Sequence, residues 1–436
     1  MNLRSWLRRR DAGYLLHRAA RLAARYGWTA GKASRRTVRF LEKAAAHRGA
    51  ATLLVPGRVL DRYPGRVLEM REAGAEIAVH SYDHFDLSAL DPAEMRAQWG
   101  RAAESFARWG IETHGFRCPY LGYSNEVRGS LPEGLFQYSS NRAIAWEPDF
   151  RGLPGEIEDF FGTLNGFYRP LPSGSFVSLP WETPPVTEIP VTVPDDLQIA
   201  DGLRLPQERV RGHWTRVLER IFARGELFNL MFHPELLPVC EPALVGFLED
   251  AGKLTPPVWF ARLKDIADWW REKDAFSVEV DPAGEGLLVR FRASARATIL
   301  VRGFPGLDGA ARPWSGGYDR IFADRIRVPS SPRPFIGLGP DVSPEARSVL
   351  RRLGYVLETG GSARSNGIFL DGPTVAKLGT EVALAEYVEA QAAPLVRFWP
   401  WPDGHRCTVC LSGDLDALTL FDYASRFLTR RPGAAA

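Results

Sequence analysis

Four short polar clusters in the sequence each follow an apolar run and carry residue types that suit hydrolytic chemistry. The first holds His80 and His84, whose spacing places two imidazoles on one face of a helical turn or tight loop, as metal ligands require. The other three are Arg117-Cys118-Pro119-Tyr120, His233-Pro234-Glu235 and Asp414-Leu415-Asp416. Hydrolysis of an amide or ester needs an activated water, a base and an acid. This inventory therefore predicts a metal site with an acid–base pair.

The elements that position these clusters follow from the apolar runs. Runs at 51–55 and 76–79 flank a helical pattern over 60–73, which is the spacing of a parallel strand–helix–strand unit. Further strands are expected at 113–116, 136–140, 176–179, 187–193 and 227–232. Because side chains at the carboxyl ends of parallel strands converge, we expect the four clusters to lie together. The repeated units predict an α/β fold, either a parallel barrel or a doubly wound sheet.

The pattern of expected secondary structure changes twice in the second half of the chain. Residues 1–273 carry the barrel pattern behind a basic N-terminal helix, and 274–334 read as a small antiparallel β unit. Residues 335–403 return to a strand–helix pattern and are expected to form a small α/β unit. Residues 404–436 supply one more strand, which ends at the two aspartates, and a helical tail that together would complete the barrel.

Charge is distributed unevenly along the 436 residues. Residues 1–40 contain ten arginines and Lys32 against Asp11 alone, so the remainder of the chain is net acidic although the total is +3. A basic arm on an acidic body does not fit a nucleic-acid binder, whose basic surface should lie on the folded domain. The arm is expected to cover one end of the barrel or to contact an anionic membrane peripherally.

The composition of the chain indicates the cellular compartment in which we expect the protein. No stretch approaches 18 apolar residues, and no signal-peptide pattern follows the basic start, so we expect a cytoplasmic protein. Four scattered cysteines do not form a disulfide framework. Cys407 and Cys410 have a redox spacing, but in a strand their sulfurs face opposite sides, and both are expected to be small buried residues. The oligomeric state is not predicted.

Three of the clusters resemble successive motifs of a known family. His80-Ser81-Tyr82-Asp83-His84, Arg117-Cys118-Pro119-Tyr120 and Leu230-Met231-Phe232-His233 are similar to motifs of the polysaccharide deacetylases, carbohydrate esterase family 4, over roughly residues 30–270. The resemblance implies a distorted parallel (β/α) barrel. It also implies a divalent metal, most often zinc with Co²⁺, Ni²⁺ or Mn²⁺ as alternatives, held by Asp, His and His.

The aspartate motif of the family should precede the histidine motif, but residues 26–32 contain no carboxylate. Asp414 and Asp416 look like that motif in its D-x-D form, displaced to the far end of the chain. The first and last strands of a barrel are neighbours, so a C-terminal strand can fill the first position, as in a circular permutation. The alternative is a deacetylase-like domain that has lost its carboxylates.

The resemblance assigns roles to individual residues. Asp416, His80 and His84 would hold the metal. Asp414 would take the proton from the attacking water, and Arg117 would pair with Asp414.

Two further roles concern the leaving group and the oxyanion. His233 would be the general acid that protonates the departing amine, and the backbone N–H of Tyr120 would help to stabilise the oxyanion. The family pairs its acidic histidine with a carboxylate. Asp195 and Asp196 lie at a suitable point in the chain, but a turn N-cap is the favoured role for either.

The expected function is a metal-dependent carbohydrate deacetylase that removes N-acetyl, or O-acetyl, groups from an acetylated glycan precursor. One alternative is hydrolysis of another linear or cyclic amide. Another is a catalytically inactive carbohydrate-binding or scaffold protein with the same fold. No role is predicted for residues 274–403.

Overall fold

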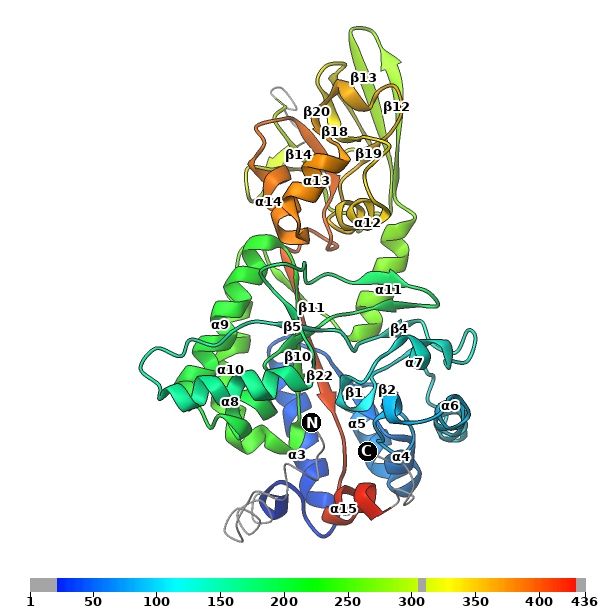
Figure 1. Ribbon diagram of the computed structural model, residues 1–436, viewed down its shortest axis with the longest axis vertical. Helices are drawn as coiled ribbons and strands as arrows, with labels where there is room; N and C mark the ends of the chain where they lie inside the picture. Colours follow the sequence, from blue (N-terminus) through cyan, green and yellow to red (C-terminus); the bar gives the residue numbers. More distant parts are fainter. Residues whose placement is uncertain (1–21, 305–310, 429–436) are drawn as a thin grey trace.

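One long, curled and mostly parallel sheet organises the main body of the protein (Figure 1). The computed structural model describes residues 22–304 and 311–428. The strand order is β6-β5-β9-β10-β22-β1-β2-β3-β4-β8-β7, and β11 also pairs with β22. The sheet is open at β6 and β7, so it forms a half-barrel rather than a closed ring, and the expected α/β fold with a mostly parallel sheet is confirmed.

The strands of this sheet have the following bounds: β1 Ala51–Val55, β2 Glu76–Val79, β3 Gly115–Phe116, β4 Tyr138–Ser139, β5 Ala143–Ala145, β6 Leu171–Pro172, β7 Trp181–Thr183, β8 Val186–Glu188, β9 Val191–Val193, β10 Leu227–Phe232, β11 Val258–Phe260 and β22 Cys407–Asp414. Only the β7–β8 pair among these described strands is antiparallel.

The C-terminal strand β22 lies in the middle of the sheet. It pairs in parallel with β1 on one side and with β10 on the other. Every residue of β22 is buried, as expected for a parallel strand that is covered on both faces. The predicted position of the C-terminal strand beside residues 51–55 is therefore observed, and Asp414 at its end lies near the ends of β1 and β10.

Helices pack around the sheet and at its ends (Figure 1). Their bounds are α3 Gly31–Ala46, α4 Gly57–Arg62, α5 Pro64–Glu72, α6 Pro92–Arg108, α7 Asn125–Gly129, α8 Gly155–Phe167, α9 Gln207–Arg224, α10 Leu237–Gly252, α11 Leu263–Asp274, α12 Pro344–Arg352, α13 Gly372–Leu378, α14 Glu381–Ala390 and α15 Leu420–Leu428. Helix α6 begins directly after Asp91, whose side chain accepts hydrogen bonds from the backbone N–H groups of Ala93 and Glu94. No helix of the described residues is both long and apolar enough to cross a membrane.

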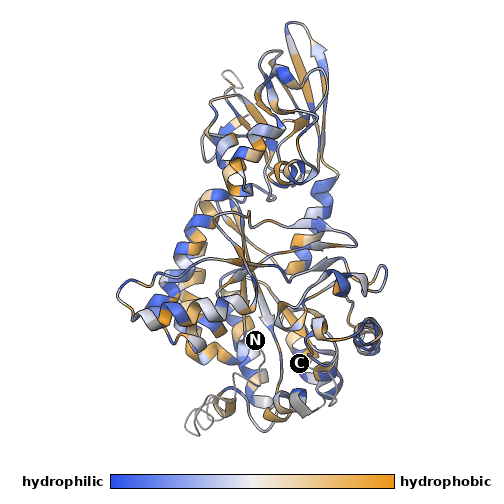
Figure 2. Cartoon of the chain, viewed as in Figure 1, coloured by the Kyte–Doolittle hydropathy of each residue, from blue (hydrophilic) through white to orange (hydrophobic). Residues whose placement is uncertain are grey.

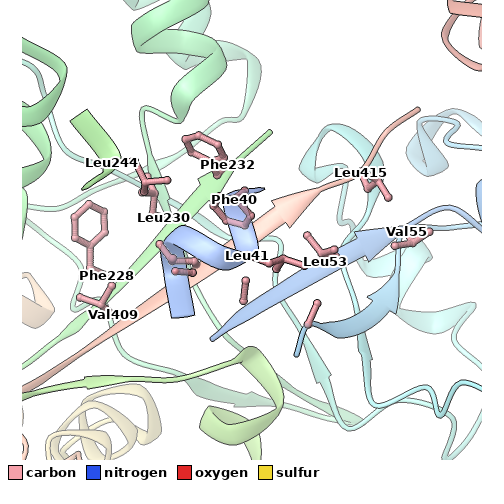
Figure 3. Close-up of a cluster of buried hydrophobic side chains, with 14 of the residues drawn as sticks. Phe40, Leu41, Leu53, Val55, Phe228, Leu230, Phe232, Leu244, Val409 and Leu415 are labelled. Carbon is pink, nitrogen blue, oxygen red and sulfur yellow. The ribbon is translucent and has the colours of Figure 1, made fainter. Parts of the chain in front are cut away.

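Alternation along the strands divides the apolar core between the two faces of the sheet. Leu53 and Val55 of β1 belong to a core with residues of α3 and α10, whereas Leu54 belongs to a second core with residues of α11. Figure 3 shows the first core, where Phe40 of α3 stacks on Phe232 of β10 with ring centroids 5.0 Å apart. Burying each such side chain contributes about 1.5–3 kcal/mol, which fixes the helices and hence the strand ends.

Residues 277–398 form three smaller sheets beyond the amino end of β22 (Figure 1). Their strands are β12 Ser277–Ala283, β13 Gly286–Arg292, β14 Ile299–Arg302, β15 Ala311–Pro313, β16 Asp319–Ile321, β17 Arg325–Pro329, β18 Arg333–Leu338, β19 Leu357–Glu358, β20 Asn366–Leu370 and β21 Leu395–Phe398. Strand β21 pairs with β14, and thus returns from the expected α/β unit to a sheet of the preceding β unit. Figure 2 shows apolar segments within these units as well as within the main body.

Two strand predictions need correction. Residues 176–179 are not a strand, because the backbone N–H groups of Val177 and Ser178 donate to the side chains of Glu381 and Glu226 instead of to a neighbouring strand. Residues 187–193 form two strands, β8 and β9, that are interrupted at Pro190, which has no N–H for a ladder.

The helical predictions also need two adjustments. The helix expected over 60–73 is divided, since Pro64 opens the new helix α5. Most of the basic arm, residues 1–21, lies outside the described residues.

Candidate active site

His80, His84 and Asp416 come together at the carboxyl edge of the sheet. The Asp416 Oδ1 atom lies 2.9 Å from His84 Nε2 and 3.5 Å from His80 Nε2. One potential ligand atom from each of the three residues lies within 4.8 Å of the others. Two imidazole nitrogens and a carboxylate oxygen are the donor set of a catalytic divalent metal site, which leaves coordination positions for water and substrate.

The strand order explains why residues so distant in sequence meet. Strand β1 lies between β2 and β22, so the loop after β2, which holds both histidines, faces the loop after β22, which holds Asp416. The histidine loop is tightly wound, with Ser81 and His84 both at a φ of 57°. The His84 backbone N–H donates to the Ser81 hydroxyl at 3.1 Å. Left-handed conformations in non-glycine residues are strained and cluster at functional sites.

The hydrogen bonding of His80 fits a cation at this point. Its Nδ1 atom lies 2.8 Å from the Arg117 carbonyl oxygen, so Nδ1 carries the proton and donates. The other ring nitrogen, Nε2, then faces the Asp416 carboxylate at 3.5 Å. A carbonyl bonded to the far nitrogen is the usual way to orient a metal-binding histidine.

The charges around His84 and Asp416 favour the protonation states that a metal needs. Burial, reinforced by the Arg426 cation and opposed by Asp416, lowers the pKa of His84 to about 4, which keeps the ring neutral at neutral pH. Burial alone would raise the pKa of Asp416, but His84 and Arg426 hold that pKa well below its usual range. Arg426 of α15 donates to Asp416 Oδ2 at 3.2 Å.

Arg117 and Asp414 form a buried ion pair beside the metal-ligand group. The fully buried guanidinium donates from Nη1 to Asp414 Oδ1 at 2.6 Å. Its remaining donors contact Ser140 and Ser412, which fixes the orientation of the side chain. The other Asp414 oxygen, Oδ2, lies 3.9 Å from His80 Nε2. The carboxylate is thus held at the edge of the ligand group with one oxygen occupied by Arg117.

His233 forms a second buried pair with Asp196. Its Nδ1 atom lies 2.7 Å from Asp196 Oδ1, and its backbone N–H donates to Asp196 Oδ2 at 2.8 Å. The two meet because β9 and β10 are parallel neighbours, so the residues that follow each strand share one edge. Burial alone would lower the pKa of His233, but the Asp196 carboxylate and its hydrogen bond raise that pKa to about 10. Potential ligand atoms of His233, Asp414 and Asp416 also lie within 4.8 Å of one another.

The two aspartates after β9 have different partners. Asp196 contacts His233 and also accepts from the backbone N–H of Leu197, so the turn N-cap and the histidine partner are both roles of this residue. Asp195 accepts from the backbone N–H of Gln198 and from the Tyr168 hydroxyl at 3.1 Å. Burial raises the pKa of Asp195 to about 7, although the nearby His233 opposes this.

Tyr120 lies at the mouth of the site. It has a φ of 60°, its side chain is 39% exposed, and its ring meets the His84 ring edge-on at a centroid distance of 5.1 Å. The exposed Phe167 of α8 packs against Tyr120, at a centroid distance of 6.0 Å. The structure therefore brings together all seven residues singled out from the sequence, each within a short distance of at least one other, and their chemical roles are proposals.

Sequence reasoning missed Arg426 and Tyr168, and favoured a turn N-cap over the histidine partnership for Asp196, which in the structure has both contacts. No signal in the C-terminal helix marks Arg426 as a site residue, because its importance arises from the position of α15 directly after Asp416. Cys407 and Cys410 are both fully buried, in separate cores, as expected of small core residues.

Comparison with known proteins identifies part of the chain. A profile of the family described as polysaccharide deacetylase matches residues 26–133. A peptidoglycan deacetylase-like protein of Gibberella zeae is 27% identical over 128 residues, which is 28% of this chain. The chain spans 37% of the length of that relative.

Solved structures with a related chain course include two that are named as polysaccharide deacetylases. The one from Mycobacterium smegmatis is 22% identical, covers 56% of this chain and 78% of its own, and has a TM-score of 0.44. The one from Pseudomonas aeruginosa is 20% identical, covers 55% of this chain and 74% of its own, and also has a TM-score of 0.44.

The curled parallel sheet, with imidazoles and carboxylates gathered at its carboxyl edge, defines an α/β half-barrel. Over residues 26–133, the sequence is similar to the polysaccharide deacetylase family.

Proposed function

We propose that the protein is a metal-dependent deacetylase that cleaves the acetamide of an acetylated carbohydrate. The observation that carries the proposal is the meeting of Asp416, from the C-terminal end of the chain, with the two histidines of the family-matched region. In this proposal Asp414 and Asp416 take the place of the aspartate motif that residues 26–32 lack. The arrangement then corresponds to a circular permutation of the deacetylase barrel.

His80, His84 and Asp416 would hold the metal, and zinc suits a set of two imidazoles and one carboxylate. When bound, such an ion supplies Lewis acidity that makes water more acidic and stabilises developing negative charge on a carbonyl oxygen. The orientation of His80 by the Arg117 carbonyl and the neutral state of His84 support this assignment.

Asp414 and His233 would supply the acid–base chemistry beside the ligand group. Asp414 accepts the proton of the attacking water, and its pairing with Arg117 keeps one oxygen oriented toward the site. His233 begins the cycle protonated because of Asp196, and donates that proton to the departing sugar amine. The backbone N–H of Tyr120 would contribute to stabilising the oxyanion, as the family resemblance implies.

The test is release of acetate from N-acetylated chito-oligosaccharides by the zinc-reconstituted protein. We expect Asp414→Asn to retain the metal, measured by elemental analysis, and to lose at least about 100-fold in kcat. The matched control is Asp403→Asn, an exposed aspartate at the other end of the strand, which should keep full activity. Acetate release by Asp414→Asn at the rate of the unmodified protein would remove Asp414 from the role of base, and no release by any of the three proteins would overturn the proposal.

A further inference from the structure

A second cavity lies at the amino end of β22, where three parts of the chain meet. Its volume is about 320 Å³. The half-barrel contributes Glu226, which immediately precedes β10, and Arg406 immediately precedes β22. The antiparallel units contribute Arg302 and Arg397, and helix α14 contributes Glu389. A cavity of this size is within the range of small-molecule sites.

The cavity wall carries guanidinium groups that outnumber the carboxylates available to neutralise them. Arg302 and Arg397 both bind the single carboxylate of Glu389, which also accepts hydrogen bonds from the hydroxyls of two tyrosines. The Nε–H groups of Arg302 and Arg397 are buried and have no hydrogen-bond partner among the described residues. Two guanidiniums therefore share one counter-charge.

Arg406 adds a third guanidinium with no acid beside it. Its side chain donates to the carbonyl oxygens of Phe222 and Ala223 at the end of α9, and no carboxylate of the described residues lies within ion-pair distance of it. The residue is 8% exposed and lies over the ring of Trp399, at 4.5 Å from the centroid. Burial and the nearby Arg397 cation lower the pKa of Arg406 to about 10, so the group is still charged at neutral pH. A buried charge without a partner costs several kcal/mol.

The acids of the cavity do not remove this excess. Burial raises the pKa of Glu226 to about 7, so near neutral pH this carboxylate opposes the guanidiniums only in part. Glu386 of α14 also lines the cavity, but its side chain is exposed to solvent. The wall thus combines desolvated guanidiniums, which bind carboxylate and phosphate oxygens well, with the flat face of Trp399.

We propose that this cavity is a binding site for a small organic anion, a carboxylate or phosphate compound, which supplies the counter-charge that Arg406 lacks. The site is separate from the proposed deacetylase centre, because β22 runs from Cys407 at the cavity to Asp414 at the metal-ligand group, a span of roughly 23 Å. A bound anion would contact the half-barrel, the antiparallel units and α14 together, and would therefore stabilise the junction between them. The proposal does not depend on the chemistry at the other end of the strand.

The experiment is isothermal titration of the full chain with inorganic phosphate and with citrate, at low ionic strength. We expect saturable binding of at least one probe. Arg406→Met should weaken the affinity for the anion at least about tenfold, because one charge-assisted contact is lost. Glu386→Gln removes a negative charge from the exposed wall of the cavity and should increase the affinity.

The exposed Arg39 of α3 provides a matched control, since Arg39→Gln removes the same charge far from the cavity and should leave affinity unchanged. If circular dichroism shows that Arg406→Met does not fold, the tightening by Glu386→Gln decides the matter. The absence of saturable binding for both probes, or binding that neither cavity variant changes, would overturn the proposal.

Discussion

The buried pair of His233 and Asp196 gives a prediction that can be tested in the metal-free protein. The Asp196 carboxylate, whose Oδ1 lies 2.7 Å from His233 Nδ1, contributes most to the raised pKa of the imidazole. Asp196→Asn keeps the size of the side chain and removes its charge. Because burial alone disfavours the imidazolium, we expect the pKa of His233 to be well below 10 in this variant.

The size of the shift follows from the same distance. Two unit charges 2.7 Å apart interact by about 6 kcal/mol at an effective dielectric constant of about 20. At about 1.4 kcal/mol per pKa unit, this sets an upper bound of about four units. Measured effects of one opposite charge on a neighbour are about one to three units, so a decrease of at least about two is expected.

The assay is a proton NMR titration of the histidine ring signals, with His233 assigned by its loss in His233→Gln. The control is Asp403→Asn, which removes the charge of an exposed aspartate at the other end of β22 and should leave the pKa of His233 unchanged. If the deacetylase proposal holds, the alkaline limb of the kcat profile should move to lower pH in Asp196→Asn. A His233 pKa that is the same in Asp196→Asn as in the unmodified protein would refute the reasoning.

Two further predictions concern stability. Arg117→Met breaks a fully buried ion pair and should lower the free energy of unfolding by about 3–5 kcal/mol in urea; a loss as small as that of the exposed Arg39→Met would contradict it. For Asp195, burial raises the folded-state pKa from 3.8 to about 7, so its contribution to stability is present below pH 3.8 and is lost as the pH rises through 7. Between pH 4 and pH 8, the stability of the unmodified protein should therefore fall relative to Asp195→Asn by about 3 kcal/mol in urea titrations, and parallel curves would refute it.

The sequence allowed the main sheet and the metal-ligand group to be anticipated because both depend on simple patterns. The runs of β1, β2 and β10 are mostly apolar and are buried along their whole length, as is typical of parallel strands, and β2 and β10 each end directly before a histidine. Asp414 could be placed beside β1 because neighbouring first and last strands are a property of barrels. No local pattern in the sequence shows which strands pair with β22. The position was inferred because Asp414-Leu415-Asp416 resembles the aspartate motif that the family carries on its first strand.

The rest depended on contacts that no local pattern encodes. Whether Asp196 caps a turn or binds His233 is decided by the pairing of β9 with β10, and the two roles prove compatible. Arg426 reaches Asp416 only because α15 turns back toward the site. The apolar segment 176–179 resembled a strand, but its N–H groups bind two glutamates whose positions are set by the tertiary fold.

The central claim is that a C-terminal aspartate and two histidines of the loop after β2 hold one metal ion. Zinc-edge anomalous diffraction from crystals of the protein grown with zinc tests it directly. We expect a peak at about 2.0–2.2 Å from His80 Nε2, His84 Nε2 and an oxygen of Asp416. A peak on the group formed by Asp195, Asp196 and His233, or no peak beside Asp416, would contradict the account.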